Sequence, residues 1–123
     1  MIKDRDPLTE KVIACVYKVH RALGPGFNES IYHNALKIAL EEDGLQFQTE
    51  KSFNVSFRGK LIGRLRLDLV IEDKVIIEVK ALTGNLPAVF ELQTLSYLKA
   101  SGHKVGLLVN FGNKSCQVRR LMV

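Results

Sequence analysis

Two carboxylates and an amine lie close together near the middle of this chain: Asp68, Glu78 and Lys80. Carboxylate oxygens are the ligands that hard cations such as Mg²⁺ or Mn²⁺ prefer, and these ions usually complete their shell with water and phosphate oxygens. A lysine beside such an ion can stabilise a metal-bound hydroxide or the charge that develops on a phosphate under attack. These residue types therefore predict a metal site suited to phosphate chemistry.

The spacing around these residues is that of two β-strands joined by a short turn. Leucines alternate with charged residues over positions 64–69, and positions 75–80 show the same period of two. The polar segment 72–74 is so short that the strands on either side must be antiparallel neighbours. A register slip of one residue would bring leucines onto the face of Glu78. The pattern therefore predicts that Asp68 lies opposite Glu78.

A second interpretation of the same residues needs no metal. The charged face would be solvated, and a diagonal pair between Asp68 and Lys80 would contribute only about 0 to 1 kcal/mol. In the predicted register Arg66 faces Lys80, and like charges in that arrangement are destabilising unless an opposite charge lies between them. The residues by themselves leave both interpretations open.

Composition limits the remaining classes. We expect one domain over residues 1–123, because the length and the 46% hydrophobic content suffice for an ordinary core. Cys15 and Cys116 have no CxxC pair and no histidine cluster nearby, so a zinc site is not indicated. No signal peptide opens the chain and no apolar stretch approaches the ~20 residues that span a bilayer, so we expect a cytoplasmic protein with no membrane partner. A net charge of +5 is compatible with a polyanionic partner.

Five strands and three helices are expected to position these residues. Apolar spacing predicts a first helix that Gly24-Pro25-Gly26 ends, and Asn28 is a suitable N-cap for a second helix. In the second helix we expect a buried stripe of Ile31, Ala35, Ile38 and Ala39. The first helix is predicted over residues 8–23, the second from its N-cap Asn28 to about Asp43, and the third from the segment 85–87 to near residues 101–102. Strands are predicted over 46–57, then, after a turn at 58–60, as a hairpin whose two strands are separated by the polar segment 72–74, and finally over 104–110 and 117–123.

This order of elements predicts an α/β protein, and it resembles the PD-(D/E)XK nuclease superfamily. That family has a restriction-endonuclease-like mixed sheet flanked by helices, here with the order ααβββαββ. Its members place an Asp on the second core strand and Glu-x-Lys on the third, which in this chain are Asp68 and Glu78-Val79-Lys80. The resemblance implies a metal-dependent nuclease.

Two further motifs are similar to those of the RecB and lambda-exonuclease branches, which add an acidic residue on the first core helix and Gln-x-x-x-Tyr on the following helix. Here the pair is Gln93 and Tyr97, and the acidic residue is Glu29 in Gly26-Phe-Asn-Glu29. The latter segment resembles the motif of the GxxExxxR proteins, except that His33 stands where the arginine is expected. Each residue also has a simpler explanation, because an acidic residue is favoured in a first helical turn and a glutamine can be solvated while a tyrosine packs.

The resemblance assigns roles to individual residues. The metal, Mg²⁺ or Mn²⁺, would be held by Asp68, Glu78, the carbonyl of Val79 and Glu29. Lys80 would assist the attacking water and Gln93 would orient a phosphate or water. Contacts with nucleic acid are expected from Arg64, Arg66, Tyr97 and His33, the last weakened because histidine is only partly protonated near neutral pH.

Three functions fit these expectations. The first is a metal-dependent nuclease that hydrolyses phosphodiester bonds in DNA; the sequence leaves open whether RNA is also a substrate. The alternative is a non-catalytic member of the fold that binds nucleic acid or a protein, and His33 is the feature in its favour. A resolvase of branched DNA would share the chemistry and would need a homodimer whose two sites face two strands.

Overall fold

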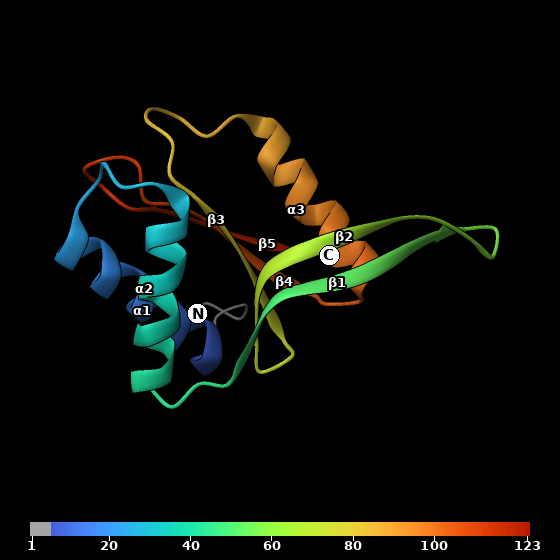
Figure 1. Cartoon of the computed structure of the whole chain (residues 1–123), viewed down its shortest axis with the longest axis horizontal. Helices are drawn as coiled ribbons and strands as arrows, with labels where there is room; N and C mark the ends of the chain where they lie inside the picture. The colour runs from blue at the N-terminus through green and yellow to red at the C-terminus, as the bar shows by residue number, and fades with distance from the viewer. Residues whose placement is uncertain (1–5) are drawn as a thin grey trace.

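A mixed sheet of five strands forms the centre of the molecule (Figure 1). The computed structural model describes residues 6–123. The elements follow one another as predicted: α1 (Pro7–Leu23), α2 (Glu29–Glu42), β1 (Phe47–Phe57), β2 (Lys60–Ile71), β3 (Val75–Lys80), α3 (Ala88–Ser101), β4 (Val105–Asn110) and β5 (Gln117–Met122). This order confirms the α/β class. No helix within the described part of the chain is long and apolar enough to cross a membrane.

The strands lie in the sheet in their order along the chain, from β1 to β5. β1, β2 and β3 are antiparallel neighbours, β3 and β4 are parallel, and β5 runs antiparallel to β4. A parallel connection needs a crossover, and α3 supplies it between β3 and β4. The central strand β3 is therefore held on both sides, which gives the charged residues at its end a rigid support.

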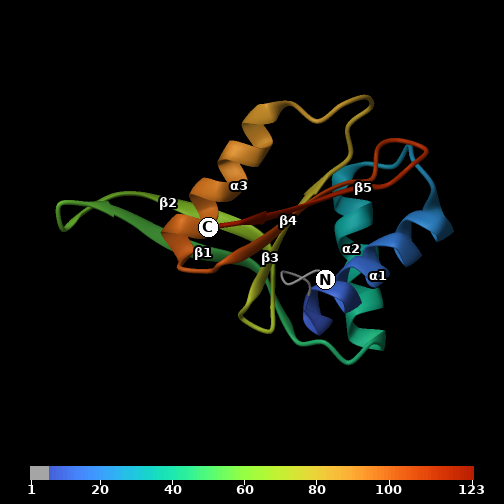
Figure 2. The same ribbon diagram turned by 180° about the vertical axis from the view of Figure 1, so that it is seen from behind.

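Helices cover both faces of the sheet (Figures 1 and 2). α1 and α2 lie together on one face, where Val12 and Val16 of α1 belong to the same buried cluster as Ile77 and Val109 of the sheet. α3 lies on the other face, over a smaller cluster that includes Ile76 and Leu98. Both faces of the centre of the sheet are thus buried, and the residues of β3 that point away from α1 and α2 are not solvated as the alternation alone would imply.

α2 presents a different stripe to the core from the one expected. The buried residues are Tyr32, Leu36, Ala39 and Leu40, whereas Ile31 is 39% and Ile38 60% exposed. Tyr32 stacks on Phe111 with ring centroids 4.6 Å apart and donates its hydroxyl to the carbonyl of Gly24. These partners, which are distant in sequence, determine which face of α2 is buried. Helical periodicity alone gives no information about them.

α3 packs closely on the sheet because β4 has a glycine beneath it. A Cβ at Gly106 would lie 3.0 Å from Thr94 Cγ2 and 3.2 Å from Ile76 Cγ1. Any side chain there would push α3 away from β3. The short distance matters because α3 carries residues that lie beside the ends of β2 and β3.

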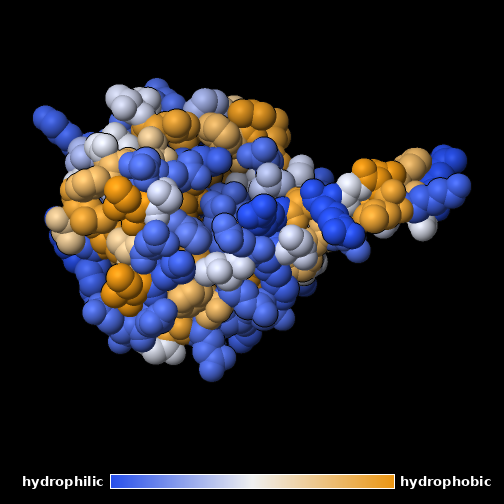
Figure 3. All heavy atoms as spheres, in the orientation of Figure 1, coloured by the Kyte–Doolittle hydropathy of each residue, from blue (hydrophilic) through white to orange (hydrophobic). Residues whose placement is uncertain are grey.

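β1 and β2 extend well beyond the rest of the molecule as a two-stranded hairpin (Figure 3). We call its distal part, residues 51–67, the hairpin arm. Its strands pair from Lys51 with Leu67 to Phe57 with Lys60, with one irregularity between Val55 and Ser56. Phe53 and Leu65, at the base of the arm, pack against the α3 cluster. The arm is therefore anchored at its base and free of the body at its tip.

Candidate active site

Asp68 and Glu78 lie opposite each other at the point where β2 and β3 part. The last paired residues are Leu69 and Ile77, and one further step in that register brings Asp68 to Glu78, as predicted. The backbone N–H of Val79 donates to Asp68 Oδ2 at 2.9 Å, which fixes the carboxylate against β3. The two carboxylates thus belong to one site.

Beyond Asp68 the two strands take different partners. The pairing of β2 with β3 ends at Leu69 and Ile77, so the expected pairing of Arg66 with Lys80 does not form. Arg66 pairs with Ser52 of β1, and Lys80 pairs with Asn110 of β4. The regular alternation also fails here, because Leu67 packs in the α3 cluster and Leu69 in the cluster of α1 and α2. Sequence periodicity assumes a straight strand, and β2 does not remain one where it leaves β3.

A backbone irregularity in β1 accompanies this change. β1 and β2 pair on either side of Glu50 and Asp68, and Glu50 itself has a φ of 50°. Residues other than glycine rarely adopt this left-handed conformation, and when they do it is often at functional sites. Glu50 forms an ion pair with Arg66 at 3.5 Å, and both side chains are largely exposed. The sequence analysis did not find Glu50, and no motif would have identified it.

Glu78 is the buried member of the site. Its side chain is 6% exposed, and its Oε1 atom has no hydrogen-bond partner among the residues that the structure describes. Burial, with the Asp68 carboxylate as the next cause, raises the pKa of Glu78 to about 8. An unpartnered buried carboxylate oxygen is costly and calls for either a proton or a cation.

α2 brings Glu29 and His33 to the same place. Asn28 caps the helix as predicted, accepting from the N–H of Ile31 at 3.3 Å, so Glu29 lies in the first turn. Burial raises the pKa of Glu29, while Lys80 lowers it. His33 Nε2 lies 3.2 Å from the carbonyl oxygen of Asp68. His33 therefore contacts the backbone at the site, and its ring is near the carboxylates rather than turned to solvent.

Lys80 and α3 complete the surroundings. The Lys80 ammonium lies 4.5 Å from the centroid of the Phe90 ring, a cation–π contact that sequence analysis did not predict. Burial, followed by the charges of Glu78 and Asp68, raises the pKa of Tyr97. Gln93 is exposed on the same helix. Of the predicted pair on α3, Tyr97 is therefore half-buried and Gln93 is exposed to solvent.

A small cavity of about 160 Å³ lies beside Asp68 and Glu29. Its lining is polar and comes from α2, β1, β2 and β3. The residues are Glu29, Ser30, His33, Glu50, Asp68 and Val79. Four predicted site residues therefore share this cavity, whereas Glu78 and Lys80 do not line it. Arg64 is exposed on the hairpin arm and Gln93 on α3.

A family model described as the PD-(D/E)XK nuclease superfamily matches residues 6–121. The chain belongs to the PD-(D/E)XK nuclease superfamily. The match does not reach the narrower GxxExxxR group, which stays a prediction. Among solved structures, the crystal structure of SSO0001 is similar, with a TM-score of 0.62 and 22% sequence identity over 93% of this chain. This chain spans 56% of the SSO0001 chain, and the likeness shows the fold alone. No curated protein matches.

In this PD-(D/E)XK protein, the donor set fits a hard divalent ion in part. No three His, Cys, Asp or Glu side chains among residues 6–123 converge closely enough to hold a metal by themselves. Asp68 and the unpartnered Oε1 of Glu78 are nevertheless paired at one place, and hard ions of this kind are commonly held by one or two carboxylates together with water and phosphate oxygens. The residues therefore suit an ion that substrate and water help to coordinate.

The segment that follows Lys80 is fixed by a buried amide. Asn110 is fully buried; it accepts from the N–H of Leu82 at 2.8 Å and donates to the Leu82 carbonyl at 2.9 Å. A Cβ at Gly112 would lie 2.3 Å from that carbonyl oxygen, so only glycine fits. These contacts hold the chain two residues beyond Lys80, and sequence analysis missed them because they join segments far apart.

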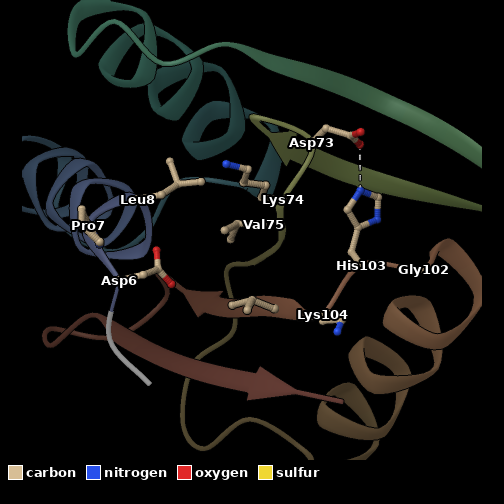
Figure 4. Close-up of a pocket in the computed structure, with 10 residues that line it drawn as sticks. Asp6, Pro7, Leu8, Asp73, Lys74, Val75, Gly102, His103 and Lys104 are labelled. Atoms are coloured by element: carbon tan, nitrogen blue, oxygen red, sulfur yellow. Dashed lines mark hydrogen bonds and ion pairs between the residues drawn. The ribbon is translucent and has the colours of Figure 1, made fainter. Parts of the chain in front are cut away.

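A larger cavity lies elsewhere, near the start of α1 and the beginnings of β3 and β4 (Figure 4). It measures about 630 Å³. His103 on its wall lies 3.0 Å from Asp73, the pair that the dashed line marks. None of the predicted site residues lines it. The smaller cavity beside Asp68 is therefore the candidate site because of the chemistry of its lining and not because of its size.

Proposed function

We propose that this protein hydrolyses phosphodiester bonds in DNA with Mg²⁺ or Mn²⁺ as its cofactor. Membership of a nuclease superfamily implies phosphodiester chemistry on a nucleic acid. One observation carries the finer proposal: Asp68 and Glu78 are held side by side, and Glu78 Oε1 is buried with no hydrogen-bond partner among residues 6–123. A structural ion pair or a solvated strand face would not leave this oxygen bare.

The metal would be held by Asp68, Glu78, the carbonyl oxygen of Val79 and Glu29. When bound, the ion would supply Lewis-acid activation of water and neutralise charge on the phosphate. Burial of Glu78 serves this role because few waters then compete for its oxygen. Glu29 adds negative charge from the rim, where the first turn of α2 also tolerates it.

Other residues would act on the substrate. Lys80, held over the Phe90 ring, would assist the attacking water and stabilise charge on the phosphate. Tyr97 would contact the backbone and Gln93 would orient a phosphate or water. Arg64 and Arg66 would bind backbone phosphates of the nucleic acid where it runs out of the site along β2. These roles need no movement of the sheet, because each side chain lies on a helix or strand or at its end.

Cleavage assays with matched variants test the proposal. Labelled linear duplex, single-stranded and four-way-junction DNA would be incubated with Mn²⁺, Mg²⁺ or EDTA. We expect metal-dependent cutting by the wild type, its loss in Asp68→Asn, and its loss in Lys80→Ala with Mn²⁺ binding largely retained by calorimetry. Cutting by Lys80→Ala at the wild-type rate would refute the assigned chemistry.

A second candidate function is a non-catalytic protein of the same fold that binds nucleic acid or a protein. The observation in its favour is that His33 replaces the arginine of the GxxExxxR motif and contacts the Asp68 carbonyl. Mn²⁺ titration separates the two candidates, because a non-catalytic scaffold has no need for metal affinity that depends on Asp68 and Glu78. Binding of DNA without cutting under any metal condition, together with no such Mn²⁺ affinity, would favour this second function.

A further inference from the structure

The hairpin arm, residues 51–67, has a charge unlike that of the rest of the molecule. It contains five of the 18 Lys and Arg residues and none of the 13 Asp and Glu residues. The remainder of the chain therefore has 13 residues of each sign, and the arm alone accounts for the net charge of +5. The basic residues are Lys51, Arg58, Lys60, Arg64 and Arg66. Concentrated charge of this kind attracts a polyanion.

The tip of the arm combines this charge with exposed apolar side chains. Phe57 is 60%, Leu61 54% and Ile62 66% exposed, although they lie within six positions of one another. Ile62 is the most exposed of the large apolar residues that the structure describes. The Arg58 guanidinium lies 5.1 Å from the centroid of the Phe57 ring. Figure 3 shows hydrophobic (orange) residues next to hydrophilic (blue) ones at the end of the arm. The tip therefore presents an exposed apolar surface with cationic side chains beside it.

We infer that the hairpin arm binds nucleic acid, with its basic side chains on the phosphates and its apolar tip against the faces of unpaired bases. The choice of nucleic acid as the partner rests on the proposed nuclease function. Base faces are apolar and are bordered by phosphates, so they match both features of the tip. Apolar side chains that enter between bases are known to favour distorted or unpaired positions.

The arm is continuous with the candidate active site. Arg66 lies in the arm, and its ion pair at 3.5 Å joins it to Glu50, which lines the cavity beside Asp68. Arg64 is two residues farther along the same strand. A DNA strand with one phosphate in the cavity would therefore pass Arg66 and Arg64 next and would reach the apolar tip of the arm last. The arm then selects DNA that has unpaired bases at a distance from the cut.

Two other partners fit less well. A second copy of this chain that docked through its own arm would bring a segment with the same positive charge and no acidic residue. Arg58, Lys60 and Arg64 have no acidic partner within ion-pair distance among residues 6–123, so their charge remains available. An anionic membrane would satisfy the charge and the apolar tip, but it would not explain why the arm begins beside the cavity.

The test measures binding in EDTA, where no cutting occurs, to two fluorescent DNA probes. One is a continuous duplex and the other is the same duplex with a three-base bulge that contains 2-aminopurine. We expect wild type to bind the bulged probe more tightly and to change its 2-aminopurine fluorescence. Replacement of the tip by Phe57→Ser, Leu61→Ser and Ile62→Ser should weaken binding to the bulged probe about 10-fold and binding to the duplex less than 2-fold.

Two further variants separate charge from apolar contact. In Arg58→Gln with Lys60→Gln, the slope of log K against log salt should fall by about 1.5 because two phosphate contacts are lost. The tip variant should leave this slope unchanged. Ile38→Ser with Met122→Ser is the matched control, since these residues are 60% and 49% exposed on α2 and β5. Ile62→Ser alone provides a milder variant if the triple one unfolds.

The outcomes separate this inference from the proposed function. A tip variant that binds the bulged probe like the wild type overturns the arm inference, even if the wild type cuts DNA. Tip-dependent binding by a protein that never cuts supports the arm and refutes the proposed nuclease. Tip-dependent binding to anionic vesicles without preference for the bulge, or tip-dependent dimerisation by light scattering with unchanged DNA binding, also overturns the inference.

Discussion

Glu78 combines two properties that conflict in a metal-free protein. It is almost fully buried, and its neighbour Asp68 carries the same charge, so the pKa of Glu78 rises to about 8. At neutral pH the metal-free carboxyl therefore keeps its proton. The charged form that a metal needs is the form that the fold penalises.

This conflict predicts an unusual pH dependence of stability. The folded state holds a proton on Glu78 up to about pH 8, whereas the unfolded state loses it near the ordinary glutamate pKa of 4.5. The folded state thus binds more protons across this window, and the free energy of unfolding should fall as pH rises from about 5 to 8. The difference should be on the order of a few kcal/mol, measured by urea unfolding in EDTA.

Glu78→Gln is the control for that measurement. An amide keeps the shape of the side chain and cannot titrate, so the fall between pH 5 and pH 8 should become much smaller. Glu29, whose pKa is raised by burial, would contribute the same slope in both proteins and cancels in the comparison. Identical slopes in the wild type and Glu78→Gln would show that Glu78 does not carry a raised pKa.

Phe90 gives a second prediction for a single residue. Its ring lies 4.5 Å from the Lys80 ammonium and holds that flexible side chain toward the site. If Lys80 is the catalytic cation, Phe90→Leu should lower the cleavage rate about 2- to 30-fold, which corresponds to ~0.5 to 2 kcal/mol for a cation–π contact. Phe90→Tyr keeps the ring and should cut nearly as fast. Mn²⁺ affinity, measured by calorimetry, should be the same in all three proteins.

At the scale of elements, the active site depends on how β3 ends. Asn110 at the end of β4 binds both backbone groups of Leu82 and also donates to Gln117 at 3.0 Å. Asn110→Ala should lower the free energy of unfolding by about 2 to 4 kcal/mol, because several buried polar groups lose their partners. Thermal and urea unfolding would measure this loss.

Asn110→Asp is the informative comparison. A carboxylate can still accept from the N–H groups of Leu82 and Gly112, but it cannot donate to the Leu82 carbonyl. Its stability near neutral pH should remain below that of the wild type and should recover in part at acid pH, where a protonated carboxyl can donate. If the Asp and Ala variants are equally unstable at every pH, the accepting hydrogen bonds contribute nothing measurable.

Local patterns predicted the elements and one register, and long-range contacts determined the rest. Alternation placed Asp68 opposite Glu78, because a one-residue slip would expose a complete apolar face. The predicted buried stripe of α2 was confirmed at Ala39 and wrong at Ile31 and Ile38, because Tyr32 is fixed by Phe111 and by Gly24. Glu50 was missed for a related reason: its place beside Asp68 follows from strand pairing at the base of a long hairpin, and its own neighbours in sequence give no sign of it.

On the scale of the whole molecule, metal binding and folding are expected to be coupled through Glu78. The residue lies at the end of the central strand, so its charge state affects the sheet that supports the site. A cation that binds only the folded protein raises its stability by mass action. Below about pH 8 the cation must also displace the Glu78 proton, which weakens binding as pH falls.

The rise in melting temperature caused by Mn²⁺ should therefore be larger at pH 8 than at pH 6. At a fixed concentration of 1,000 times the dissociation constant measured at pH 8, binding would add about 4 kcal/mol, or roughly 15 °C for a chain of this size. Asp68→Asn should lose most of this rise at both pH values. Differential scanning fluorimetry with Mn²⁺ and EDTA measures it, and equal rises at both pH values would contradict the coupling between the Glu78 proton and the metal.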